Sequence, residues 1–140
     1  MTYKLTVNPK DDYLHAIVTG LNSRENVARY LDEIRRECAA RNYCRVLIEE
    51  RLDGPRLETM DVFDISSEAS GRALGMFKAV AYVDVNAGSD LMHFAETVAV
   101  NRTLPVKIFS TVADAEQWLL DDARRGAEPR ASAPADNPRR

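Results

Sequence analysis

Apolar and polar positions alternate along the first twenty residues in two short runs. In the first run, YKLTV, the side chains of Tyr3, Leu5 and Val7 fall on one face of an extended segment. The second run, YLHAIVTG, is rich in β-forming residues and ends at Gly20. The turn-forming letters NPKDD lie between the two runs. This pattern predicts a β-hairpin at the start of the chain.

The next segment has the period of a helix. Asn22 is suited to cap its start, with Glu25 three residues further on, as in a capping box. Charged residues occupy the other faces of the segment. Apolar residues recur at helical spacing at Val27, Tyr30, Leu31, Ile34 and Cys38. The segment therefore predicts an amphipathic helix that lies on a sheet.

The remaining segments alternate between strands and helices. The apolar runs RVLIEE, FKAVAYVDV and PVKIFS are typical of buried parallel strands. Helices are predicted for PRLETMDVFDISSEAS, with Pro55 in its first turn, for SDLMHFAETVAVNR, and for TVADAEQWLLDD, capped by Thr111. The order ββαβαβαβα predicts an α/β fold with a mainly parallel five-stranded sheet, an antiparallel edge strand and four helices.

The last part of the chain differs in composition from the rest. Residues 122–140 are rich in alanine, proline and arginine and have no apolar period. We therefore expect one domain over residues 1–121, followed by a disordered tail over residues 122–140.

Composition restricts the class of protein. The 140-residue chain has a formal net charge of −3 and no basic block within the predicted domain, which argues against nucleic acid as a partner. No apolar run approaches the roughly 20 residues of a membrane span, and MTYKLTV does not have the pattern of a signal peptide, so we expect a cytoplasmic protein. Cys38 and Cys44 are interpreted as two small buried thiols rather than a disulfide or a ligand pair.

Acidic and basic residues collect where the predicted parallel strands end, the edge at which open α/β sheets bind ligands. A pair such as Glu50 and Asp84 has the chemistry for acid–base work or for holding a divalent cation. The favoured interpretation is instead that Glu49, Glu50 and Asp84 end strands at the water line, because no nucleophile–base pair lies nearby. We therefore assign no catalytic residue, metal or cofactor. The candidate residues for partner or ligand binding at this edge are Glu50, Asp53, Arg56, Asp84 and Asn86.

Two further groups of residues have the chemistry of a site. His93 and Glu96 lie three apart on a predicted helix, but His15 has no paired ligand motif, so satisfied or exposed histidines are favoured over a metal site. Met60 and Phe63 lie on the second predicted helix, where core packing is the simpler explanation. If that helix exposes part of Leu57, Met60 and Phe63, the patch would be a binding site for a partner.

Several segments occur in a characteristic order: RVLIEE before a turn and helix, FKAVAYVD as the next strand, and FAETVAVNR before LPVKIFSTVADAEQWL. Together with the element order, they resemble the SpoIIAA-like (STAS) fold family, and most closely its small bacterial STAS/SEC14-like proteins. The resemblance spans about residues 3 to 121 and implies a non-enzymatic module that binds a partner protein or a second copy of itself. Some members of the family bind a nucleotide or small ligand, and the resemblance implies this as a further possible role.

The resemblance also implies where a regulatory site would lie. In anti-sigma-factor antagonists a Ser or Thr preceded by Asp is phosphorylated in the turn after the third strand. Here Asp53 is followed by Gly54 and Pro55, and the nearest hydroxyl is that of Thr59, inside the predicted helix. The alternative function is a carrier or sensor of a small, partly apolar ligand, lipid-like or a nucleotide, held between the second and third helices and the sheet.

Overall fold

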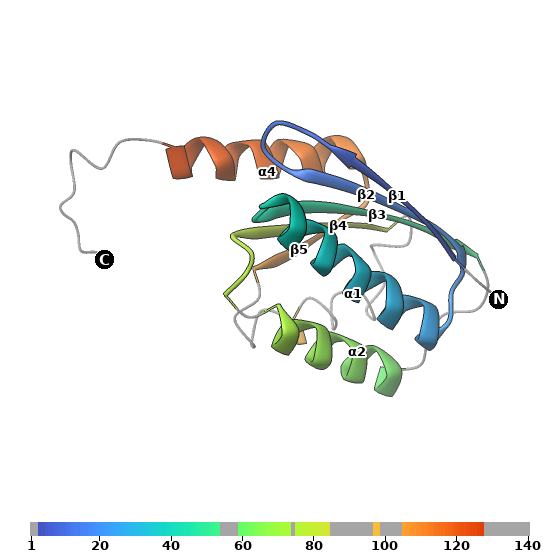
Figure 1. Ribbon diagram of the computed structural model, residues 1–140. Helices are drawn as coiled ribbons and strands as arrows, with labels where there is room; N and C mark the ends of the chain where they lie inside the picture. Colours follow the sequence, from blue (N-terminus) through green and yellow to red (C-terminus); the bar gives the residue numbers. More distant parts are fainter. Residues whose placement is uncertain (1–2, 54–58, 74, 85–96, 99–104, 128–140) are drawn as a thin grey trace.

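Five strands form one sheet in the order β1-β2-β3-β4-β5 (Figure 1). The computed structural model describes residues 3–53, 59–73, 75–84, 97–98 and 105–127. Its elements are β1 (Tyr3–Pro9), β2 (Leu14–Leu21), α1 (Arg24–Arg41), β3 (Arg45–Asp53), α2 (Thr59–Arg72), β4 (Ala79–Asp84), β5 (Val106–Phe109) and α4 (Val112–Ala127).

The pairing of the strands confirms the predicted sheet. β1 is antiparallel to β2, and their hairpin is closed by a hydrogen bond from the Lys10 N–H to the Tyr13 carbonyl at 2.9 Å. The pairs β2–β3, β3–β4 and β4–β5 are all parallel. The predicted third helix, over residues 89–102, lies almost entirely outside the described residues.

The first helix begins one residue later than predicted. Ser23, not Asn22, is the N-cap: its backbone is extended, and its Oγ accepts a hydrogen bond from the Asn26 N–H at 3.1 Å. The Asn22 N–H instead donates to the Asp53 carbonyl at 2.6 Å, which ties the residue to the end of β3. The helix ends at Arg41, and its C-cap Asn42 has a φ of 61°, the left-handed conformation common after helix ends.

A hydrophobic core lies on each face of the sheet. On one face α1 and Ile65 of α2 pack against the strands, and α2 lies alongside α1. On the other face α4 covers β4 and the start of β3, with Leu119 completely buried. Among the described residues, no helix is both long and apolar enough to cross a membrane.

The last helix starts as predicted and ends later. Thr111 Oγ1 accepts a hydrogen bond from the Asp114 N–H at 3.2 Å, which confirms the predicted cap. The helix continues to Ala127, so residues 122–127 are helical although the sequence placed them in a disordered tail. Arg45 of β3 pairs with Asp122 at 2.8 Å, which gives this extension a contact with the sheet. Residues 128–140 lie outside the described residues.

Candidate functional site

Glu50 is at the centre of a hydrogen-bonded cluster on the α1 face of the sheet. The Tyr30 hydroxyl, from α1, donates to Glu50 Oε2 at 2.5 Å, and the Tyr82 hydroxyl, from β4, donates to the same oxygen. The two hydroxyls also contact each other. Asp84 is the partner of Glu50 in the register between β3 and β4. We call Tyr30, Glu50, Tyr82 and Asp84 the carboxyl cluster.

Burial controls protonation in the carboxyl cluster. It raises the pKa of Glu50 above its ordinary value, while the hydrogen bonds from Tyr30 and Tyr82 lower it and the neighbouring Asp84 carboxylate raises it. Burial, together with the charge of Glu50, also raises the pKa values of both tyrosines well above the usual range. The two hydroxyls therefore remain protonated hydrogen-bond donors, and Glu50 keeps its proton to a higher pH than an exposed glutamate does.

The carboxyl cluster corrects the water-line interpretation of the acids. β3 does not end at Glu50 but continues to Asp53, so Glu49 and Glu50 lie inside a paired strand. Glu49 and Asp84 are both only 6% exposed, so neither side chain lies at the water line. Glu50 and Asp84 are brought together as the sequence indicated. They meet two tyrosines that the sequence reasoning had placed only in the core.

Glu49 points to the opposite face of the sheet, where it meets a histidine. His15 Nε2 lies 2.9 Å from Glu49 Oε1, and the Arg51 guanidinium pairs with the other carboxylate oxygen. Of the two alternatives expected for the histidines, satisfied or exposed, His15 is therefore the satisfied one. His93 lies outside the described residues. Within the described part of the chain, no three His, Cys, Asp or Glu side chains are grouped as metal ligands.

The other candidate residues lie around the start of α2. Asp53 ends β3 with an exposed side chain, and Thr59 begins α2. Met60 is 67% exposed, and Phe63 is half-buried. The predicted sites at Arg56, Leu57 and Asn86 lie outside the described residues, as does nearly all of the third helix that was expected to line a ligand space.

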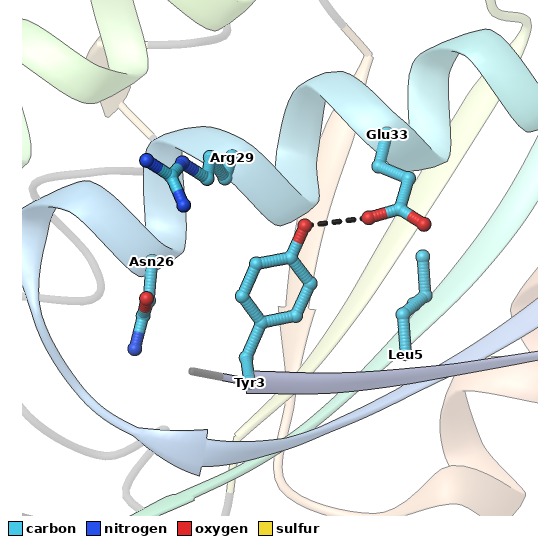
Figure 2. A pocket seen from close by; sticks show the side chains of 5 residues that line it. All are labelled: Tyr3, Leu5, Asn26, Arg29 and Glu33. Atoms are coloured by element: carbon cyan, nitrogen blue, oxygen red, sulfur yellow. Dashed lines mark hydrogen bonds between the residues drawn. The ribbon is translucent and has the colours of Figure 1, made fainter. Parts of the chain in front are cut away.

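Sequence reasoning missed a groove between β1 and α1 (Figure 2). Its volume is about 270 Å³, and its lining residues are Tyr3, Leu5, Asn26, Arg29 and Glu33. We call it the β1–α1 groove. The alternation of Tyr3 and Leu5 and the helical stripe of Asn26, Arg29 and Glu33 are both visible in the sequence. The position of β1 across α1 brings the two patterns together.

The Tyr3 hydroxyl lies at the centre of the groove. It donates to Glu33 Oε1 at 2.5 Å (Figure 2). Burial and this hydrogen bond raise the pKa of Tyr3 to about 12, so the phenol is a donor at neutral pH. The Tyr3 ring packs edge-on against the Tyr30 ring, with 6.0 Å between the ring centroids. This contact connects the groove to the carboxyl cluster.

The chain is similar in structure to an uncharacterised protein of the DUF3478 family with a SpoIIAA-like fold from Shewanella loihica PV-4. The TM-score is 0.52 and the sequence identity 21%, over 84% of this chain and 93% of that chain. No protein-family model and no curated protein matches this chain. The likeness shows the fold, which confirms the predicted SpoIIAA-like α/β architecture.

Proposed function

We propose that this chain is a non-enzymatic binding module and that a partner protein docks on the surface at the start of α2. The observation that carries the proposal is the exposure of Met60. Its side chain is 67% exposed, and it is the one large hydrophobic side chain exposed among the residues that the structure describes. Because the thioether side chain of methionine is flexible, an exposed Met60 is suited to pack into an apolar pocket of another protein.

The surroundings of Met60 favour a fixed binding surface. Arg24, in the first turn of α1, lies 3.6 Å from Asp61 and 3.6 Å from Asp64 of α2. These pairs orient the start of α2 on α1, although each is exposed and contributes little to stability. The exposed Asp53 at the end of β3 adds negative charge to this part of the chain. We therefore expect a partner with an apolar pocket bordered by basic residues.

The carboxyl cluster supports binding rather than catalysis. A general acid or base must reach a proton of the substrate. The Glu50 carboxyl is already engaged within the protein: the hydroxyls of Tyr30 and Tyr82 donate to its Oε2, and Asp84 lies beside it. The cluster is instead suited to hold α1 on the sheet, because it joins one residue of the helix to two neighbouring strands.

Site-specific crosslinking tests the proposal. A photoreactive benzoylphenylalanine replaces Met60 in one variant and Ala113, exposed on α4, in the control variant. After irradiation in cells, the position-60 variant is expected to give a discrete adduct with one protein, which mass spectrometry identifies, and Met60→Asp is expected to abolish binding of that protein. An adduct with twice the mass of the chain identifies a second copy as the partner. The proposal fails if positions 60 and 113 give the same products.

A further inference from the structure

Two opposite charges in the β1–α1 groove are left apart. Arg29 and Glu33 are four residues apart on α1, a spacing at which opposite charges commonly pair. Two such pairs do form on the same helix, Arg36 with Asp32 at 3.1 Å and Arg41 with Glu37 at 3.0 Å. In both of those pairs the acid precedes the base, which is the more favourable order, whereas in the groove the order is reversed.

Each charge of the groove has capacity for a further partner. Glu33 uses Oε1 to accept the hydrogen bond from the Tyr3 hydroxyl, and an ionised carboxylate accepts several more. Arg29 makes no ion pair with any residue that the structure describes, although its charge acts on the Tyr3 phenol. Figure 2 shows the Arg29 guanidinium and the Glu33 carboxylate on opposite sides of the Tyr3 hydroxyl. The groove therefore presents a cation and an anion separately.

The rest of the groove is partly apolar and held in place. The ring of Tyr3 and the side chain of Leu5 provide the apolar surface, and both side chains are half-buried. Tyr3 is held by Glu33 and by the buried ring of Tyr30. Asn26 is 4% exposed, and its amide nitrogen donates to the Leu21 carbonyl at 2.9 Å. A ligand would meet these side chains without ordering them first, which favours binding.

We propose that the β1–α1 groove binds a small amphoteric molecule with an apolar body, of the chemical class of a free amino acid. Its carboxylate pairs with the fork of Arg29, its ammonium group with Glu33, and its apolar body lies on Tyr3 and Leu5. The volume of about 270 Å³ suits a ligand of this size. This site is separate from the surface at Met60 and does not depend on a protein partner there.

The test uses three probes that share a phenyl ring and differ in their charged groups. L-Phenylalanine carries both groups, 3-phenylpropionate lacks the ammonium group, and 2-phenylethylamine lacks the carboxylate. Each is titrated to about 10 mM into ¹⁵N-labelled full-length protein, because a ligand of this size is expected to bind with a dissociation constant of about 1 mM. L-Phenylalanine is expected to shift the amide resonances of Leu5, Asn26 and Glu33, and to bind more tightly than both analogues.

Two variants test whether the charge of Arg29 is required for binding of L-phenylalanine. Arg29→Gln is expected to weaken binding of L-phenylalanine about tenfold or more, because a bidentate charged contact is lost. Arg41→Gln, on the same helix and away from the groove, is the matched control and is expected to bind as the parent protein does. Unchanged amide resonances of residues outside the groove verify that the Arg29→Gln variant is folded. Any of three results overturns the proposal: no shift in the groove, an analogue that binds as tightly as phenylalanine, or unchanged binding by Arg29→Gln.

Discussion

Replacing Tyr30 by phenylalanine removes one hydroxyl from the centre of the carboxyl cluster and leaves the buried ring in place. Tyr30 is 0% exposed, so bulk water does not reach the position of its hydroxyl, although Glu50 itself is only half-buried. A hydrogen bond to a charged group contributes about 1.5–3 kcal/mol to stability. Because Glu50 keeps Tyr82 as a donor, we expect the lower part of that range, about 2 kcal/mol.

The loss in free energy of unfolding caused by Tyr30→Phe is expected to depend on pH. The Tyr30 hydroxyl stabilises the charged form of Glu50, so its removal raises the pKa of Glu50 further. For a carboxyl whose pKa is raised in the folded protein, the stabilising contribution is complete below the ordinary value of 4.5 and is lost as the pH rises through the folded value. We therefore expect Tyr30→Phe to cost more free energy of unfolding at about pH 7 than at about pH 4.

Urea denaturation measures both effects. Trp118, the single tryptophan, lies on α4 and packs against Phe109 of β5, so its fluorescence reports unfolding. A loss of 2 kcal/mol corresponds to a fall of about 1 M in the urea midpoint. Tyr43→Phe is the matched control: its hydroxyl donates to the Lys10 carbonyl in an exposed position, where water can replace it, so we expect about 0.5 kcal/mol or less. Equal costs for Tyr30→Phe and Tyr43→Phe, or no pH dependence, would refute the reasoning.

Three further predictions concern the core, the helix cap and the thiols. Leu119→Ala, at a completely buried position on the inner face of α4, is expected to lower the free energy of unfolding by about 2–5 kcal/mol, which the same urea assay measures. Ser23→Ala is expected to cost about 1 kcal/mol through the lost hydrogen bond to the Asn26 N–H, and a cost near zero would contradict the assigned cap. Burial raises the pKa of Cys38 to about 12, whereas Cys44 is only partly buried rather than buried in the core as predicted. Iodoacetamide is therefore expected to alkylate Cys44 well before Cys38, as mass spectrometry of the native protein would show.

Local patterns in the sequence were sufficient to predict most of the fold. Val27, Tyr30, Ile34 and Cys38 recur at helical spacing, and all four are buried on the inner face of α1. The strands were recognised because their apolar runs are continuous, as in sheets covered on both faces. The cap of α1 was misplaced because Asn22 and Ser23 are both good capping residues. The choice between them depends on the contact of Asn22 with Asp53, which is distant in the sequence.

The site was harder to predict because it depends on contacts between distant segments. Glu50 at the end of RVLIEE has the appearance of a solvent-exposed acid, and its burial follows only when β3 is extended and Tyr30 and Tyr82 approach it. The β1–α1 groove likewise requires Tyr3 and Glu33, thirty residues apart, to meet. Neither contact leaves a periodic signal in the chain.

The strand order has a consequence for how the protein is made. Each strand pairs with the one that precedes it in the chain, so the sheet can lengthen in the order in which the ribosome releases the strands. The core under α4 cannot follow that order, because Tyr13, near the start of the chain, shares it with Leu119. A nascent chain that has not yet released α4 therefore carries a finished sheet with one apolar face exposed to water. Chaperones that recognise apolar surface are expected to bind that intermediate, and completion of α4 is expected to release them.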